Sequence, residues 1–373
     1  MPPVITVPDS APPQARSSPP AQPSIDPPDV PRPVAVHTLD DRIALVGSLA
    51  AALALVWMAF GFLLPWSGKV GFVLCWFAVF LATYAAVSAL SNPRPIVVER
   101  VMAAVVTGGA VVVGVSLGSA VVFTFARGAQ ALVHLNFYAN DMAGVRPLDP
   151  VVRGGLVHAM VGSLIEIGIA VAITLPLGLG TAVFMSEVGG RLAQVVRTVV
   201  EAMTALPSIV AGLFIYTVML VALHIPPTGF TAAMAISVMM LPIIAAAADV
   251  TLRVVPGGLR EASLALGASQ WQTVWRVVLP TARPGLATAL ILGVARGVGE
   301  TSPVLLTSGA STFFNANPFE QPMNSLPLFV FAAVRSGQPT FIARGFGAAA
   351  VLLALVLVLF VITRVLARQR TGR

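Results

Sequence analysis

The 373-residue chain has little charge, one lysine, one cysteine and four histidines, and these shortages exclude several classes of protein. Charged residues make up only 10% of the sequence, whereas hydrophobic residues make up 57% and the mean hydropathy is +0.90. A soluble protein of this size has too small an interior to hide so much apolar surface. Several apolar runs are long enough to cross about 30 Å of hydrocarbon as helices, and they lack the alternation of a membrane barrel. The composition therefore predicts an all-α polytopic membrane protein.

The rare residues also limit the chemistry. The single cysteine, Cys75, excludes a disulfide within the chain, and the four histidines show no metal-ligand spacing. The only lysine, Lys69, stands in W-S-G-K-V, where Leu63 and Val70 occupy positions that a phosphate loop fills with glycine and with serine or threonine. We expect no ATP site, metal or other cofactor in this chain, and no enzyme activity, because no nucleophile–base cluster is present.

The apolar runs predict eight membrane spans. Residues 1–40 contain twelve prolines and no apolar core, so we expect a disordered tail and no cleavable signal peptide. The loop 127–155 is expected to be polar with a short surface helix, and 307–344 to be a long extramembrane loop. Pro207 and Pro242 are expected to kink their helices. The predicted spans are approximately 43–64, 70–90, 101–126, 156–185, 199–223, 229–248, 285–306 and 346–362.

The basic residues predict the orientation of these spans. The net charge of +7 does not indicate nucleic-acid binding, because arginines are spread along loop ends without a basic-aromatic cluster. With the N-terminus in the cytoplasm, 15 Lys and Arg residues fall inside, 6 fall outside and one, Arg296, lies within a span. The positive-inside rule favours this orientation, which puts both termini and residues 251–284 in the cytoplasm.

One stretch between spans, 260–280, predicts two short amphipathic helices. Leu259, Ala262 and Leu266 share a face of the first, and Gly267 allows a turn with positive φ. Ser269 and Gln272 have the spacing of a capping box that begins the second helix. The second helix is predicted to carry an apolar stripe, and Pro280 is expected to end this helix. This stripe consists of Trp271, Val274, Trp275 and Val278.

Periodicity alone leaves two interpretations of this hairpin open, an interfacial helix on lipid headgroups or a docking surface for another protein. The detailed pattern resembles the E-A-A…G…I-x-L-P signature of permease subunits of ABC importers, with Ser263 in place of the second alanine and Val277 in place of isoleucine. In that family the segment is the cytoplasmic coupling loop that docks on the ATPase subunit. The coupling residues that the resemblance implies are Arg260, Glu261, Ala262, Ser263, Gly267, Trp271, Leu279 and Pro280.

A second unusual stretch places charge inside a span. Arg296 lies near the middle of 285–306, with Glu300 one turn later on the same face, followed by Thr301, Ser302 and Pro303. An arginine at this depth costs about 2.5–3.5 kcal/mol on insertion scales, so such charges usually face a cavity or a partner. The pair either locks two helices together or lines an anion pathway, in which the guanidinium fork fits tetrahedral oxyanions. Glu166, in another span, either pairs with an arginine of a neighbouring helix or lies at a water-filled vestibule, and we expect a structural role. Asp249 is expected to be solvated at a span end.

The same stretch extends the resemblance. A-R-G-V-G-E-T-S-P-V-L-L-T is similar to the A-R-x-x-G-E-T-A-P-L-L-x-T segment of A-type permeases of the bacterial phosphate ABC importer, and residues 204–217 are similar to that family's A-P-S-I-V-x-G-L-F segment. Residues 175–187 and 321–327 fit as well. The resemblance covers about 100–370 and implies a substrate pathway that includes Arg296, Glu300, Thr301 and Ser302.

The resemblance also implies an architecture and a set of partners. It implies the type I importer permease fold, with a six-helix core in 96–373, a coupling loop at 255–283 and two extra membrane helices in 41–95. The partners would be a second, C-type permease, an ABC ATPase homodimer that binds ATP and Mg, and an extracytoplasmic phosphate-binding protein, all at a bacterial inner membrane. Alternatives are a permease for sulfate or molybdate, the C-type partner itself, or a secondary anion transporter, which would need inverted repeats that we do not find.

Overall fold

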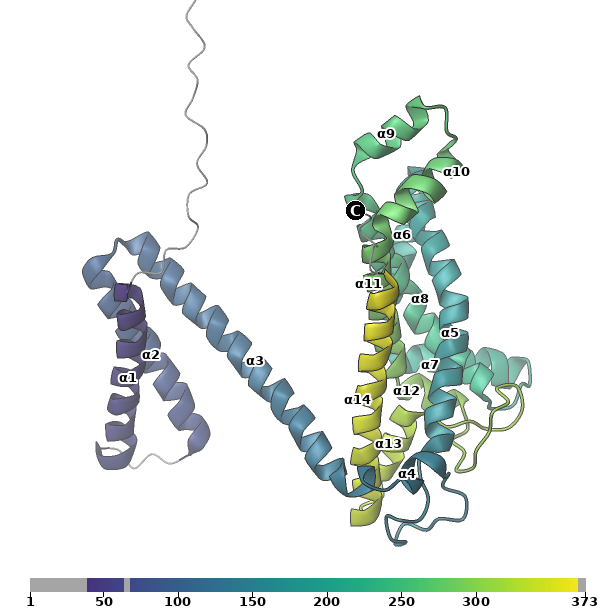
Figure 1. Ribbon diagram of the computed structural model, residues 1–373, viewed down its shortest axis with the longest axis horizontal. Coiled ribbons are helices and arrows are strands. Elements are labelled where there is room, and N and C mark those ends of the chain that lie inside the picture. The colour runs from purple at the N-terminus through teal and green to yellow at the C-terminus, as the bar shows by residue number, and fades with distance from the viewer. Residues whose placement is uncertain (1–38, 64–67, 368–373) are drawn as a thin grey trace, which may run out of the picture. The chain divides into compact units, whose positions relative to one another are not determined.

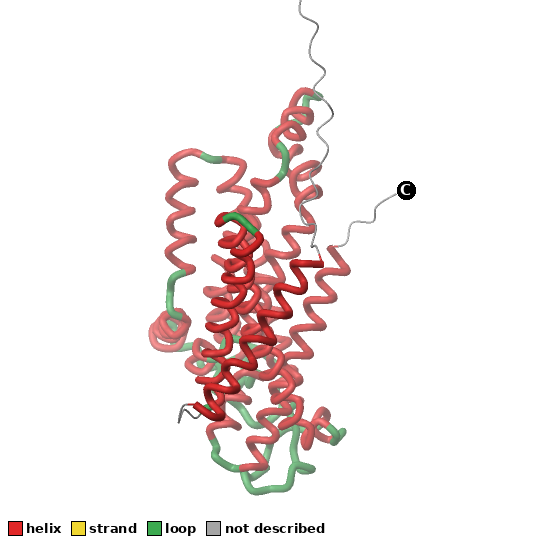
Figure 2. The backbone as a smooth tube through the Cα atoms, turned by 90° about the vertical axis from the view of Figure 1, so that its left-hand side faces the viewer, coloured by secondary structure: helices red, strands yellow, loops and turns green. Residues whose placement is uncertain are grey.

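The fold is that of a computed structural model, which describes residues 39–63 and 68–367. Nearly all of the predicted tail, 1–40, lies outside this range. The described residues contain helices and no β-strand, which confirms the all-α prediction (Figure 2). They divide into two compact units, and the boundary between Val112 and Val113 falls inside the long helix α3 (Arg94–Leu132).

Within residues 39–63 and 68–367, seven helices are long and apolar enough to cross a membrane, and a bent helix pair would make eight. Apolar side chains on most of these helices are exposed, as expected for surfaces that meet lipid or another subunit. The chain is therefore a multi-pass membrane protein. The seven segments are Asp41–Leu63, Lys69–Ser91, Arg94–Leu132, Val157–Val188, Gly229–Val254, Gln270–Val298 and Pro339–Val365.

The first unit contains α1 (Leu39–Met58), η1 (Ala59–Leu63), α2 (Lys69–Ser91) and the beginning of α3. Its small core consists of Ala52, Phe80 and Tyr84, and the rings of Phe80 and Tyr84 stack with centroids 5.7 Å apart. Arg100 of α3 forms an ion pair with Asp41 of α1 and donates a hydrogen bond to Ser88 of α2. The three helices are thus joined at one end by polar contacts.

The second unit is built around α8 (Gly229–Val254), the most buried of the candidate spans. It packs against α5 (Val157–Val183) and α11 (Leu279–Val298), and α11 also packs against α14 (Pro339–Ala367) (Figure 1). A Cβ atom on Gly178 of α5 would lie 2.9 Å from Ile244, and one on Gly293 of α11 would lie 2.4 Å from the same residue. Glycine at these positions lets both helices approach α8 closely. Pro242 lies inside α8, which continues through it.

The predicted single span 199–223 is wrong in shape. The structure has two helices in this region, α6 (Gly190–Thr204) and α7 (Ser208–Ile215) with its extension η3 (Tyr216–Ala222), bent by 104°. Pro207 lies at the bend in an extended conformation with ψ 135°. Proline restricts the residue before it to extended conformations and has no N–H for the preceding helix, so α6 ends here and a new helix begins.

The predicted long loop 307–344 is also wrong in part. It contains the helix α13 (Leu326–Arg335), and α14 already begins at Pro339. Leu326, Leu328 and Phe329 of α13 are buried against the bundle. Their packing compensates for the helix-breaking residues around them, which obscure the helix in the sequence. The expected short helix in 127–155 is present as α4 (Asn136–Ala139).

Two ends of the second unit can be distinguished in Figure 1. The helix α4 and the longest loops lie at the lower end, whereas α9 (Gly257–Ala265) and α10 (Gln270–Thr273) lie at the upper end. The hairpin predicted from 260–280 therefore projects from one end of the helical bundle.

Candidate functional site

The hairpin forms by the local rules that its sequence predicts. The helix α9 ends before Gly267, which has φ +85° and donates its N–H to the Leu264 carbonyl at 2.9 Å. Ser269 and Gln272 form a reciprocal capping box at the start of α10, with N–H donors 3.0 and 3.3 Å from the two side-chain acceptors. The turn and the second helix are therefore both specified by nearest neighbours in the chain.

The second helix does not end at Pro280, contrary to the prediction. It continues from α10 through η4 (Val274–Val278) into α11, so that Gln270–Val298 is one helical segment. The turn before Pro280 is a wide π-helix, and Pro280 is the second residue of α11. The hairpin and a membrane helix consequently share one backbone.

The predicted apolar stripe divides into two faces. Val274 and Val278 are buried, with exposed fractions of 6% and 0%, and Val278 belongs to a core cluster with Ala182 of α5 and Leu252 of α8. Trp271 and Trp275 are 64% and 57% exposed, and their rings meet edge to face at 5.6 Å. Leu266, at the tip, is 90% exposed. One face thus anchors the hairpin, while the outer face presents aromatic and aliphatic surface.

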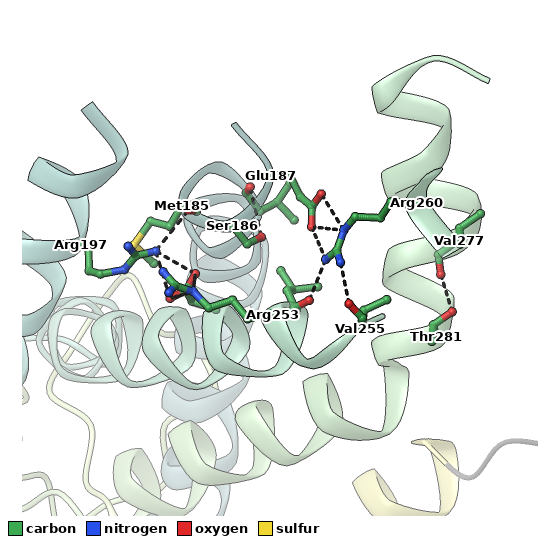
Figure 3. A network of polar contacts seen from close by, with 12 residues as sticks. Met185, Ser186, Glu187, Arg197, Arg253, Val255, Arg260, Val277 and Thr281 are labelled. Atoms are coloured by element: carbon green, nitrogen blue, oxygen red, sulfur yellow. Dashed lines mark hydrogen bonds and ion pairs between the residues drawn. The ribbon is translucent and has the colours of Figure 1, made fainter. Parts of the chain in front are cut away.

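Arg260, one of the predicted coupling residues, binds the bundle (Figure 3). Its Nη2 lies 2.8 Å from Oε1 of Glu187 in η2 (Phe184–Val188), and its Nε lies 3.3 Å from both carboxylate oxygens. The same guanidinium donates to the carbonyls of Val255 at 2.6 Å and Leu252 at 2.9 Å. These carbonyls lie at the C-terminal end of α8, where helical donors are missing.

The other predicted coupling residues lie along the same hairpin. Ser263 and Thr273 are joined by a hydroxyl–hydroxyl hydrogen bond of 2.9 Å, which links α9 to α10. Glu261 and Ala262 are exposed, whereas Leu279 and Pro280 are half-buried where α11 begins. The hairpin therefore brings all the sequence-predicted coupling residues into one structural unit.

A second ion-pair cluster lies nearby and was not predicted. Asp249 of α8 is only 6% exposed, so its expected solvation is wrong. Its carboxylate accepts hydrogen bonds from Nη2 of Arg197 in α6 at 3.2 and 3.3 Å and from Nε of Arg253 at 3.2 Å. Arg197 also donates to the Met185 carbonyl at 3.2 Å (Figure 3). The cluster joins α6, α8 and the end of the α5 segment.

The polar stretch in the predicted span 285–306 is a break between two helices. The helix α11 ends at Val298 and α12 (Ser302–Thr307) begins three residues after Gly299. Nε of Arg296 lies 2.6 Å from Oε1 of Glu300, and their side chains are 54% and 8% exposed. Among the described residues, the terminal guanidinium nitrogens of Arg296 and the hydroxyls of Thr301 and Ser302 have no hydrogen-bond partner. These groups are available to a polar ligand.

The break is held in place by close packing of α12. A Cβ atom on Gly212 of α7 would lie 2.5 Å from the Cα of Pro303. At the other end of α12, the Thr231 hydroxyl of α8 donates to the Thr307 carbonyl at 2.8 Å. The two stretches that resemble the phosphate permeases, 204–217 and 295–307, therefore meet in the fold at the contact of α7 with α12.

Of the two surroundings expected for Glu166, an arginine partner is not found among the described residues. Its side chain is 1% exposed inside the helical bundle, and its Oε1 has no hydrogen-bond partner among the described residues. Within the same residues, no group of three or more His, Cys, Asp or Glu side chains has the arrangement of a metal site.

Comparisons with known proteins identify the class. Residues 174–371 match the family described as "Binding-protein-dependent transport system inner membrane component". The chain is 38% identical over 232 residues to "Phosphate transport system permease protein PstA 1" of Mycobacterium tuberculosis strain H37Rv, which covers 62% of this chain and 75% of the relative. It is 37% identical over 232 residues to PstA of Mycobacterium leprae, which covers 62% and 76%, and 33% identical over 215 residues to PstA of Haemophilus influenzae, which covers 57% and 75%.

The chain also aligns with the MetNI methionine ABC transporter in an inward-facing conformation, at 22% identity and a TM-score of 0.43, over 57% of this chain and 93% of that one. The fold defines a polytopic helical membrane protein, and the family match covers more than half of its length. The chain belongs to the inner membrane components of binding-protein-dependent transport systems, and within them it is similar to the PstA phosphate permeases.

Proposed function

We propose that this chain is the A-type permease subunit of an ATP-driven importer of inorganic phosphate. It supplies part of the membrane path for the anion and performs no hydrolysis itself. The observation that carries the proposal is that one chain contains both a hairpin held to the helical bundle by Arg260 and a break between α11 and α12 that bears Arg296. This chain is similar to proteins named as phosphate transport permeases.

The hairpin supports a separate ATPase partner. Its outer face exposes Trp271, Trp275 and Leu266, while its inner face is fixed to α5 and α8. A surface of this kind meets the apolar pocket of another protein better than water. The partner would be an ABC ATPase homodimer that holds ATP and Mg, and closure of that dimer would move the hairpin. This arrangement requires residues 255–283, and with them both termini, to lie in the cytoplasm.

The break supports passage of an oxyanion. Arg296 is oriented by Glu300 and keeps its terminal N–H groups free, which is the donor pattern that a tetrahedral oxyanion accepts. The hydroxyls of Thr301 and Ser302 add donors beside it. A C-type permease would form the other wall of the path, and an extracytoplasmic binding protein would deliver the phosphate.

The proposal assigns a role to each segment of the permease region. Residues 96–373 form the permease with its coupling loop at 255–283, and 41–95 add two membrane helices whose role lies outside the shared mechanism. The runner-up function is transport of another oxyanion, sulfate or molybdate, because the donors at Arg296 fit any of these anions.

The experiment is uptake of radiolabelled phosphate by cells in which this gene is deleted and then restored. We expect uptake to fall on deletion, to return on restoration, and to resist competition by sulfate and molybdate. Uptake of sulfate or molybdate that depends on the gene, with phosphate uptake unchanged, would favour the runner-up. The purified chain alone should hydrolyse no ATP, and hydrolysis in a preparation free of the ATPase would contradict the assignment.

A further inference from the structure

We propose that Glu187 and Arg260 are positioning residues whose contact carries movement of the hairpin into α5 and α8. The inference rests on the proposed function, since it assumes that a partner moves the hairpin. It adds a specific route for that movement, made of two side chains that lie 73 residues apart in the sequence.

The first step is that α9 has no apolar anchor. No residue of Gly257–Ala265 is buried, and its Leu259 and Leu264 side chains are 43% and 44% exposed. Helices in proteins are held mainly by a buried apolar face, and α9 has no buried residue. Its side-chain attachments are two polar contacts, of Arg260 with the bundle and of Ser263 with Thr273 of α10.

The second step is the geometry of Arg260. The guanidinium bridges a carboxylate on the end of the α5 segment and two carbonyls, of Leu252 and Val255, at the end of α8. Its side chain is 23% exposed and that of Glu187 is 15% exposed, so water competes only partly for these bonds. A planar fork with several donors can satisfy three acceptors together, which a lysine ammonium does less well because it lacks the fixed geometry.

The third step is that the two helices of the hairpin are connected to the bundle in different ways. The helix α10 continues through η4 into α11, so this arm moves α11 through its own backbone. The other arm, α9, reaches α8 along the chain only through the turn at Val255 and Pro256. The hydrogen bonds of Arg260 connect α9 across that turn to the end of α8 and also to Glu187 at the end of the α5 segment. The ion pair of Asp249 with Arg197 connects the same end of α8 to α6.

The positional part of the proposal is tested by amide hydrogen exchange on the full-length chain in detergent. Glu187→Gln and Arg260→Gln should each raise exchange in 257–268 by about tenfold, because each removes charge-assisted hydrogen bonds. The double variant should not exceed Arg260→Gln, since Glu187 acts only through the Arg260 guanidinium, which also holds the carbonyls of Leu252 and Val255. Arg191→Gln is the matched control. Arg191 is an exposed arginine of α6, outside the coupling loop and without an ion pair among the described residues, and its replacement should leave exchange in 257–268 unchanged.

The transmission part is tested in the complex assembled with its ATPase and second permease. Both Gln variants should lose at least about tenfold in phosphate uptake while ATP hydrolysis stays within about twofold of the original. If a Gln variant fails to insert, Arg260→Lys replaces it, because it keeps the charge but loses the fork. Unchanged exchange in 257–268, additive effects, or a proportional fall of uptake and hydrolysis would overturn the proposal. A wild-type complex that hydrolyses ATP but moves no phosphate would refute the proposed function instead, and exchange would still decide the contact.

Discussion

The contact between α7 and α12 offers a sharp test of how the polar break is held. A methyl group added at Gly212 would lie 2.5 Å from the Cα of Pro303, closer than nonbonded carbon atoms approach in proteins. The obstacle is backbone, so the helices must separate by about an ångström to restore contact near 3.5 Å. Overpacking of this kind costs about 1–3 kcal/mol, while replacing a helical glycine by alanine returns about 0.5–1 kcal/mol. The net effect of Gly212→Ala should be a loss of about 0.5–2 kcal/mol.

The assay compares thermal stability of the purified chain with phosphate uptake in cells. Gly212→Ala should lower the melting temperature and reduce uptake severalfold, because α12 and the break before it are displaced. Gly168→Ala is the matched control: this glycine is also helical, lies in α5, and has open space within 4 Å of an added Cβ. The control should be neutral or slightly stabilising. If Gly212→Ala is as stable and as active as the control, then the close approach of α7 to α12 does not position the break.

Five further substitutions test other parts of the site. Arg296→Gln should abolish phosphate uptake and destabilise the chain by about 1–3 kcal/mol, because the Glu300 carboxylate loses its partner. Adding Glu300→Gln to this variant should restore stability but not uptake. If uptake also recovers, the Arg296–Glu300 pair is purely structural. Gly267→Pro requires φ near −65° where the chain has +85°, and it removes an N–H that donates a hydrogen bond. In this variant, and in Glu261→Arg at an exposed position, membrane insertion should persist while transport uncouples from ATP hydrolysis. Normal phosphate uptake in both variants would argue against docking at the hairpin. Leu266→Ser should change stability by less than about 0.5 kcal/mol, because the side chain is 90% exposed, yet weaken co-purification of the ATPase; undiminished co-purification would place the docking surface elsewhere.

Much of the fold can be predicted from local signals. Long apolar runs identify the spans because no soluble fold accommodates them, and the hairpin follows from a glycine with positive φ and a capping box, which act between near neighbours. The break after Val298 is likewise indicated by Pro303 and the polar residues before it.

The parts that could not be predicted depend on tertiary packing. The helix α13 forms among prolines and asparagines because Leu326, Leu328 and Phe329 are buried against other helices. The helical path through Pro280 depends on a π-helical turn that the sequence does not indicate. Tertiary packing can override local propensity in this way.

The ion pairs near the hairpin could not be predicted either, because they also depend on tertiary packing. Arg260 finds its partner Glu187 73 residues away, and Asp249 is buried by helices that meet only in the folded bundle. A clue was present in the sequence, because acidic residues at the ends of the spans 156–185 and 229–248 lie on the side where arginines are concentrated. Such a clue suggests that opposite charges pair but not which residues do so.

The most direct measurement follows phosphate and ATP in the same proteoliposomes, which contain this chain, its permease partner and the ATPase. We expect phosphate to accumulate only when ATP is hydrolysed, and accumulation to stop when the ATPase is omitted, even under an imposed proton or sodium gradient. Accumulation driven by such a gradient without the ATPase would contradict the account and make the chain a secondary transporter.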